Sequence, residues 1–209
     1  MQIDVVSFVG AVVREVENRE RNGHPVRAVV ASRDYDTDVD DLWDALTTAE
    51  RIPRWFLPVS GDLRPGGKYQ FEGNAGGAIT ACEPPRRLAV TWEFGGQVSW
   101  VEVDLADAPG GRARLTLEHV VPVDDHWVRF GPGAVGVGWD LTLMGLVLHL
   151  ASGAAADKAE AAAWSGSEEG KAFVRRSAEA WCAAHIASGE DEAAARTTSA
   201  LTAKFYTGG

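Results

Sequence analysis

His119 is the ionisable side chain whose place in the sequence offers the most chemistry. Residues alternate over Arg112–Val121, and His119 falls on the same side of this predicted strand as Leu115 and Leu117. A histidine on an apolar face titrates near neutral pH, so it can act as a general base or hydrogen-bond a ligand. A strand-end histidine bonded to a backbone carbonyl fits the same pattern, and the sequence leaves both interpretations open.

Two carboxylates lie on the preceding predicted strand, and their direction decides whether they can do chemistry. Glu102 and Asp104 share one strand face. Facing inward, such a pair could act as general acid and general base. The opposite face carries Val101, Val103 and Leu105, which form the apolar set expected in the core. We therefore expect Glu102 and Asp104 to face solvent.

Two further motifs could bind a metal ion or a nucleotide. Asp124, Asp125 and His126 have metal-binding side chains, but their spacing fits no standard ligand signature, so we expect a solvated loop and no metal. The run Gly131–Gly136 satisfies G-x-G-x-x-G, which binds a dinucleotide only inside a strand–helix–strand unit. The strands upstream are predicted to be antiparallel, so we interpret the run as a turn that leads into a helix. No cofactor is expected.

The composition indicates which binding partners and which cellular compartment to expect. The formal net charge is −10, and the chain lacks the clustered Lys and Arg residues that bind nucleic acid or anionic membranes, so neither partner is expected. Cys82 and Cys182 lie far apart and fit no metal spacing. The N-terminus carries no signal-peptide pattern, and we expect a reduced, cytoplasmic setting.

The residues from Trp139 to Leu150 are expected to form the core helix around which the other elements pack. This run is apolar on nearly every face, which is typical of a buried helix. It is shorter than the roughly 20 apolar residues of a membrane span, and it opens with an acid. We expect the helix to begin at Gly136 or Gly138, with Asp140 in its first turn and Gly153 just after its end.

Alternating runs and turn residues upstream predict a hairpin, a helix and an antiparallel meander. The hairpin covers residues 12–32 and turns at Asn22-Gly23, the strongest short-range hairpin signal. Helical spacing follows over Val39–Ala49, with Asp38 or Thr37 as the N-cap. Short loops then separate five predicted strands: Lys68–Glu72, Ala78–Cys82, Leu88–Phe94, Val98–Leu105 and Arg112–Val121.

The remainder of the chain, rich in Ala, Glu and Ser, predicts helices and no strands. Ser167 is placed to cap a helix that runs to about Ser188, with Gly189 stopping it. One face of this helix carries Phe173, Ser177, Trp181 and His185. A shorter helix before it and another over about Asp191–Phe205 complete the tail. We therefore expect a domain over residues 1–150, with the hairpin as an N-terminal extension, and a helical tail over residues 151–209 packed on it.

Several short motifs together resemble one protein family. Arg54-Trp55-Phe56 resembles its "ARWF" element, and Pro65–Tyr69 resembles its "pGG.Y" turn. Pro84–Leu88 with Thr91-Trp92 resembles "PPrrL..TW", and Gly138-Trp139 resembles the "GW" that opens the last helix. Over about residues 26–150 the sequence is similar to the SRPBCC (START/Bet v 1-like) superfamily, in the branch homologous to the ATPase activator of the 90-kDa heat-shock protein.

This resemblance implies an α+β helix-grip fold, in which an antiparallel sheet wraps around a long C-terminal helix. Members of the superfamily, among them lipid carriers, hormone receptors and polyketide cyclases, enclose an apolar cavity between sheet and helix. The named branch consists mainly of bacterial proteins without established activity, so the resemblance implies a fold more than a function. The residues expected at such a cavity, or in a filled core at the same place, are Trp92, Phe94, Leu117, His119, Trp139 and Met144.

We expect a cytoplasmic protein, monomer or homodimer, that binds a small apolar or aromatic ligand. Such a pocket is mostly apolar, with a few polar groups that fix the ligand's orientation. Two alternatives stay open from the sequence. One is a cavity enzyme of the polyketide cyclase or hydrolase type with His119 as its base. The other is a co-chaperone-like interaction module that binds a protein partner, for which the helical tail offers a surface.

Overall fold

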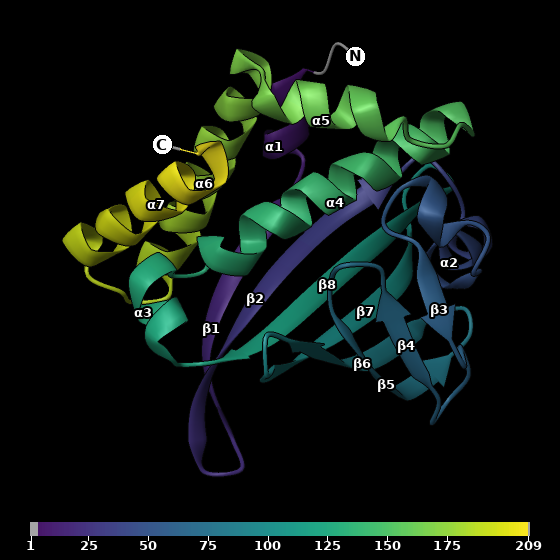
Figure 1. The fold of residues 1–209 in the computed structure, drawn as a ribbon, viewed down its shortest axis with the longest axis horizontal. Coiled ribbons are helices and arrows are strands. Elements are labelled where there is room, and N and C mark those ends of the chain that lie inside the picture. Colours follow the sequence, from purple (N-terminus) through teal and green to yellow (C-terminus); the bar gives the residue numbers. More distant parts are fainter. Residues whose placement is uncertain (1–3, 209) are drawn as a thin grey trace. The chain divides into compact units, whose positions relative to one another are not determined.

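The protein, seen in a computed structural model that describes residues 4–208, has a helix-grip α+β fold (Figure 1). One eight-stranded sheet has the order β1-β2-β8-β7-β6-β5-β4-β3, and every register between β3 and β8 is antiparallel. The strands are β1 (Val13–Arg21), β2 (His24–Tyr35), β3 (Val59–Gly61), β4 (Lys68–Phe71), β5 (Gly76–Glu83), β6 (Arg87–Phe94), β7 (Gln97–Ala108) and β8 (Arg112–Pro122). The helices are α1 (Val5–Gly10), α2 (Val39–Thr47), the 3₁₀ turn η1 (Ile52–Arg54), α3 (Asp125–Phe130), α4 (Gly133–Ser152), α5 (Lys158–Gly166), α6 (Glu168–Ala187) and α7 (Glu192–Thr207).

The chain folds as two compact units built from alternating segments. Unit 1 takes Met1–Ala31, Pro122–Met144 and Asp157–Gly209, and unit 2 takes Ser32–Val121 and Gly145–Ala156. Unit 1 therefore unites the N-terminal hairpin with the helical tail, whereas a boundary at residue 150 assigns them to different parts. Strand β2 and helix α4 each contribute residues to both units.

The elements of unit 1 follow local signals in the sequence. Asn22 and Gly23 have positive φ angles of 52° and 77°, which confirms the two-residue turn predicted between β1 and β2. Ser167 caps α6, and its side chain accepts a hydrogen bond from the amide of Gly170. The four residues predicted to share one face of α6 are all buried. That face has partners within unit 1, because α6 contacts β1, α1 and α7.

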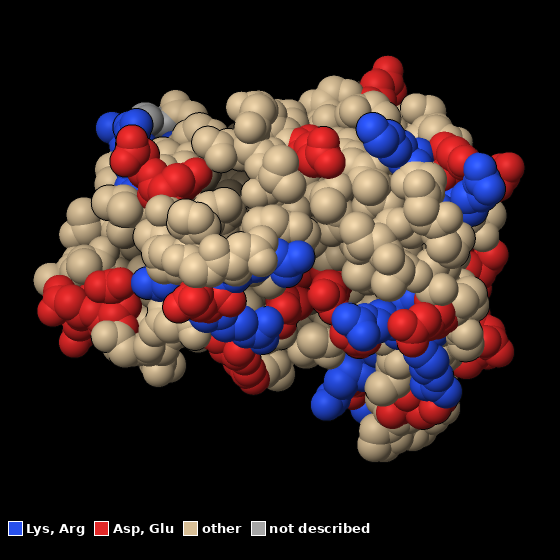
Figure 2. Space-filling view, turned by 90° about the horizontal axis from the view of Figure 1, so that it is seen from below, with Lys and Arg blue, Asp and Glu red and all other residues tan. Residues whose placement is uncertain are grey.

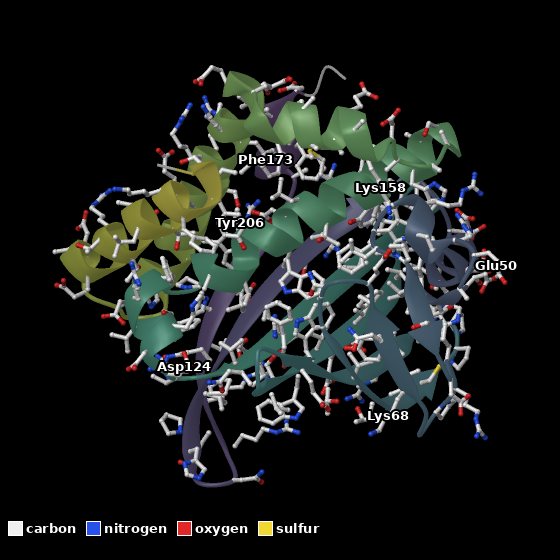
Figure 3. All side chains as sticks on the ribbon, in the orientation of Figure 1. Glu50, Lys68, Asp124, Lys158, Phe173 and Tyr206 are labelled. Carbon is white, nitrogen blue, oxygen red and sulfur yellow. The ribbon has the colours of Figure 1, made fainter. Side chains whose placement is uncertain are left out.

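Phe173 marks the centre of this packing. Figure 3 labels it on α6, and its ring centroid lies 5.6 Å from that of Phe8 on α1 and 5.7 Å from that of Trp164 on α5. All three rings are buried. The helical tail is therefore joined to the N-terminal helix through aromatic contacts.

The core helix α4 begins at Gly133, earlier than the sequence predicts, and its glycines explain the difference. Glycine is a poor helix former, so the run before Trp139 resembles a loop when propensity alone is considered. In the structure Gly133, Gly136 and Gly138 lie against side chains of Thr202, Trp181 and Tyr206, the last of which is labelled in Figure 3. A Cβ at Gly133 would lie only 2.8 Å from Thr202 Cγ2, and one at Gly136 would overlap the Trp181 indole. Close packing within unit 1 thus requires glycine and overrides its low propensity.

Asp140 was expected in the first turn of this helix. Because α4 begins at Gly133, Asp140 lies beyond the first turn, and it is fully buried. Its Oδ2 accepts hydrogen bonds from Arg14 Nε and Nη2 at 3.1 and 3.0 Å, from Ser177 Oγ at 2.5 Å and from Trp181 Nε1 at 3.2 Å. Arg14 Nη1 also donates to two backbone carbonyls, one in α1 and one just after it. Burial raises the pKa of Asp140, and these donors oppose the rise. We call Arg14, Asp140, Ser177 and Trp181 the Asp140 network.

The expected solvated loop at residues 124–126 is wrong, because these residues begin the helix α3. The Asp124 carboxylate accepts a hydrogen bond from the amide of Trp127 at 2.9 Å and so caps the helix. Trp127 and Phe130 are buried in unit 1, and the burial of these two rings stabilises the short helix.

Unit 2 contains the predicted meander, with β3 as an additional edge strand that the sequence did not predict. Val101, Val103 and Leu105 are buried, as expected for the core face of β7. Glu102 forms an ion pair with Arg87 at 2.7 Å, and Asp104 is exposed, so neither carboxylate enters the core.

Within residues 4–208, α4 is the one helix long and apolar enough to cross a membrane by length and composition. The long core helix of a helix-grip fold meets the same criteria, so this finding is weak evidence for a membrane span.

Candidate functional site

Five aromatic side chains of unit 2 touch one another in a continuous cluster. Trp55 stacks on Phe56 with ring centroids 5.8 Å apart, and Phe56 meets Phe71 edge-on at 4.9 Å. Phe71 in turn contacts Tyr69 at 5.3 Å and Trp92 at 5.8 Å. These residues come from the segment after η1 and from β4 and β6. We call them the aromatic cluster.

Hydrogen bonds and a close backbone contact hold this cluster in place. The Trp55 indole N–H donates to the carbonyl of Ala45 in α2 at 2.9 Å. The Trp55 carbonyl faces Gly145 of α4, where a Cβ would lie 2.6 Å from its oxygen. Tyr69 donates its hydroxyl proton to the carbonyl of Thr91 at 2.8 Å, and burial raises the pKa of this hydroxyl. The cluster is therefore anchored to α2, β6 and the C-terminal half of α4.

His119 lies beside the cluster on the buried face of β8. Its side chain is only 3% exposed, and its ring meets the ring of Trp92 edge-on at 6.0 Å. Its Nε2 lies 2.8 Å from Ser99 Oγ on β7. The structure thus brings together Trp92 and His119, two of the residues expected at the site, and adds Ser99.

His119 has the chemistry of a neutral imidazole. Burial lowers its pKa to about 3, so it stays unprotonated at neutral pH. Ser99 Oγ donates its single proton to the carbonyl of Trp92 at 3.1 Å. His119 Nε2 then carries a proton of its own and donates it to Ser99 Oγ. In this arrangement the pair orients hydrogen bonds, and His119 does not act as a base toward Ser99.

The sheet face next to the cluster changes from buried to half-buried between two neighbouring strands. Val101 and Val103 on β7 are buried, whereas Val90 and Leu88, their partners on β6, are half-buried. Directly opposite residues of an antiparallel pair share a face, so this one face is sealed at β7 and partly open at β6. Four rings of the cluster are half-buried as well: Trp55, Phe56, Phe71 and Trp92.

Phe94 does not belong to this site, although alternation puts it on the same side of β6 as Trp92. It is 60% exposed. Phe94 is the last residue of β6, and its partner across the turn, Gln97, is exposed too. The strand pair therefore extends past the covered part of the sheet at this end. Alternation predicts the side of a strand but not its depth, and the expectation that Phe94 lines a cavity is corrected.

The other predicted site residues fall in two places. Leu117 is buried on β8, two positions before His119 and on the same face. Trp139 is half-buried and Met144 is buried, and both lie in the part of α4 that belongs to unit 1. Their role as ligand-binding residues stays a prediction.

Sequence reasoning missed Ser99 and Phe71 as members of the site. A serine or a phenylalanine within an alternating strand gives no separate signal of its function. Trp55, Phe56 and Tyr69 carried a usable signal, because each lies in a motif through which the sequence resembles the SRPBCC superfamily.

A metal-binding cluster or a basic patch among the described residues would indicate another kind of site. Among residues 4–208, no group of three or more His, Cys, Asp or Glu side chains is placed to hold a metal ion. On the face drawn in Figure 2, Lys and Arg side chains are interspersed with Asp and Glu. Opposite charges pair locally in unit 2, as Arg114 does with Asp34 at 2.7 Å.

Residues 36–151 match the family model described as Activator of Hsp90 ATPase homolog 1-like protein, a range that spans more than half of the chain. The chain belongs to this family. The matched range includes the whole aromatic cluster, Ser99 and His119. The Activator of Hsp90 ATPase homolog 1-like family is the branch that the sequence motifs resemble, and with the helix-grip fold it makes the chain a member of the ligand-binding SRPBCC class. No curated protein matches the chain.

Solved structures extend the likeness beyond the family range. The crystal structure of CalU16 from Micromonospora echinospora is 33% identical, with a TM-score of 0.65, over 83% of this chain and 98% of that one. The solution structure of CalU16 gives 31% identity and a TM-score of 0.70 over 85% of this chain and 97% of that one. These shares exceed residues 36–151, so the likeness also covers part of the flanking sequence. PFC0360w, an Hsp90 activator from Plasmodium falciparum, is 22% identical with a TM-score of 0.52 over 59% of this chain and 96% of that one, and shares the fold alone.

Proposed function

We propose that the protein binds a small apolar or aromatic ligand against the aromatic cluster of unit 2, in the cytoplasm and without chemical turnover. The observation that carries this proposal is the half-buried state of four of the five rings. Sites for small ligands are lined mainly by aromatic and apolar side chains, with a few polar groups that fix orientation. The aromatic cluster has this composition, and His119 and Ser99 supply the polar groups.

The geometry of the rings suits a flat ligand. Their centroid separations, between 4.9 and 5.8 Å, are typical of edge-on and offset aromatic pairs. Four of these rings are half-buried and so keep apolar surface in contact with water. A ligand that removes this apolar surface from water gains about 25 cal/mol for each Å² buried.

The alternative, a hydrolase-like enzyme, is supported by one contact: Ser99 Oγ lies at a distance of 2.8 Å from His119 Nε2. A nucleophilic serine needs a neighbouring base that accepts its proton. The pKa of His119, lowered by burial to about 3, makes its imidazole a weak base. Ser99 also has a carbonyl acceptor for its proton. These features favour binding over catalysis. The cytoplasmic setting is supported by the free state of both cysteines.

The proposal is tested by titrating the protein with 2-methylnaphthalene and following the fluorescence of this probe. We expect saturable binding by the wild type. Trp92→Ala removes one contacting ring and should weaken binding about tenfold, which corresponds to about 1.4 kcal/mol. Phe94→Ala is the matched control, because Phe94 lies on the same side of the same strand but is exposed, and it should leave the affinity unchanged.

Two results would contradict the proposal. One is an absence of saturable binding by the wild type. The other is an equal loss of affinity in Trp92→Ala and Phe94→Ala, which would place the probe on the exposed end of β6. Hydrolysis of a p-nitrophenyl ester that disappears in His119→Ala would support the enzyme instead.

A further inference from the structure

His149 lies in the C-terminal half of α4, within unit 2, and is buried with 4% of its surface exposed. Its Nδ1 is 2.8 Å from the carbonyl oxygen of Ala154, which follows the helix. A carbonyl oxygen can only accept a hydrogen bond, so Nδ1 must carry the proton. In the neutral form of the imidazole this contact fixes the tautomer and leaves Nε2 with a lone pair.

This lone pair accepts no hydrogen bond from the part of the chain that the structure describes. His149 Nε2 is buried, and no group among residues 4–208 hydrogen-bonds it. A buried acceptor without a partner costs free energy comparable to that of a lost hydrogen bond. Native structures keep such atoms mainly where a water, an ion or a ligand completes them.

The position of His149 connects it to the aromatic cluster. Gly145 precedes it by one helical turn, so the two residues lie on one face of α4. Gly145 is the residue against which the Trp55 carbonyl packs, at 2.6 Å from a Cβ built there. The neighbouring Arg54 binds the segment that follows this helix twice, through its guanidinium to the Gly153 carbonyl and through its own carbonyl to the amide of Ala156. His149 therefore shares the helix face on which Gly145 meets the backbone of Trp55, a member of the cluster.

We propose that His149 Nε2 accepts a hydrogen bond from the ligand, so that the ligand class is a flat aromatic molecule with a hydroxyl or N–H donor, such as a phenol. This inference rests on the proposed function, because it places the ligand on the aromatic cluster. The rings supply apolar contact for the body of the ligand. His149, held in one tautomer by Ala154, selects the polar substituent.

The test compares two probes of nearly equal size, 2-naphthol and 2-methylnaphthalene, which differ by a hydroxyl against a methyl group. We expect the wild type to prefer 2-naphthol about tenfold, because the hydroxyl completes an otherwise unpaired buried acceptor. His149→Phe should abolish the preference while it keeps binding of 2-methylnaphthalene. Trp92→Ala should weaken binding of both probes and leave their ratio unchanged.

The ¹⁵N resonance of His149 Nε2 gives a second measurement that needs no variant. It should shift when 2-naphthol binds and stay in place when 2-methylnaphthalene binds. Equal affinity for the two probes, or an unchanged resonance with 2-naphthol bound, overturns this inference and leaves the proposed function intact. That result assigns the lone pair to a buried water. Failure of both probes to bind overturns the proposed function, and this inference with it.

Discussion

The two units differ in how far they bury their aromatic residues. In unit 1 most rings are buried, namely Phe8, Trp127, Phe130, Trp164, Phe173 and Trp181, whereas Trp139 and Tyr206 are half-buried and Phe205 is exposed. In unit 2, Tyr69 is the buried member of a five-ring cluster, and the other four rings are half-buried. A sealed ring contributes its full apolar area to stability, whereas a half-buried ring retains surface for another molecule. The buried rings of unit 1 thus serve packing, and the half-buried cluster of unit 2 serves, on our proposal, recognition.

Buried polar groups differ between the units in the same sense. In unit 1 the charge of Asp140 is met by Arg14, with Ser177 and Trp181 donating to the same oxygen. Breaking one side of such a pair is costly, because it leaves a charge in a site without water. In unit 2 the buried polar groups near the cluster include the imidazoles of His119 and His149, which contact Ser99 Oγ and the Ala154 carbonyl. The buried network of unit 1 thus contains an ion pair, whereas the imidazoles near the cluster of unit 2 are held by a hydroxyl and a backbone carbonyl.

The largest expected effect compares one tryptophan from each unit. Trp181→Ala should lower the free energy of unfolding by about 3–5 kcal/mol, because it empties a fully buried site and removes a donor to Asp140. Trp92→Ala should cost roughly 1–2 kcal/mol, since that ring is only half-buried. Urea unfolding of both variants measures the difference. Equal losses would mean that the unit 2 cluster is a packed core.

The next effect tests the Asp140 network. Arg14→Leu should lower the free energy of unfolding by about 3 kcal/mol, because it leaves the buried Asp140 carboxyl without its guanidinium partner. Arg196→Leu is the matched control: its ion pair with Glu192 is exposed, and the expected loss is below about 1 kcal/mol. The double variant Arg14→Leu/Asp140→Leu should recover part of the loss. If Arg14→Leu cost no more than the control, the network would not determine the stability of unit 1.

The smallest effect is the pH dependence that His119 gives to unit 2. Its pKa is about 3 in the folded protein against a reference value of 6.5, so between these values the unfolded state binds one more proton. Stability should therefore fall as the pH drops below about 6.5, by up to about 1.4 kcal/mol per pH unit, and His119 should have no such effect above that range.

Urea unfolding at pH about 7.5 and about 5 measures this slope. His119→Gln should show a shallower slope than the wild type. His126→Gln, which changes an exposed histidine, should keep the slope of the wild type. Identical slopes in all three proteins would mean that His119 is accessible to protons in the folded state.

Local signals in the sequence were sufficient for most strands and helices, whereas β3, α3 and the start of α4 were not predicted. The Asn22-Gly23 turn and the Ser167 cap each depend on neighbours within a few residues, so both were predictable. The start of α4 was not, because its glycines are helical only in the presence of side chains from α6 and α7. Asp140 was misplaced for the same reason, because its position in the helix depends on where α4 begins, and its partner Arg14, 126 residues away, could not be predicted either.

The candidate site was predictable in part. Trp92 and His119 were predicted because strand alternation assigns each residue to one side of the sheet. The same rule failed for Phe94, because alternation does not tell at which residue of a strand burial ends. The tautomer of His149 depends on a carbonyl that follows the helix, a detail of geometry that residue types do not encode.

The close approach of Gly136 to Trp181 has a consequence for how sequences of this kind can evolve. A Cβ at position 136 would overlap the Trp181 indole, so a larger residue at position 136 requires a smaller residue at position 181. Relatives that keep unit 1 should therefore show these positions changing together, with a larger residue at position 136 accompanied by a smaller one at 181. A larger residue at 136 alone would be eliminated by selection. The same substitution should be tolerated in a lineage that had already replaced the tryptophan, so the order in which the two mutations arise decides whether the path is open.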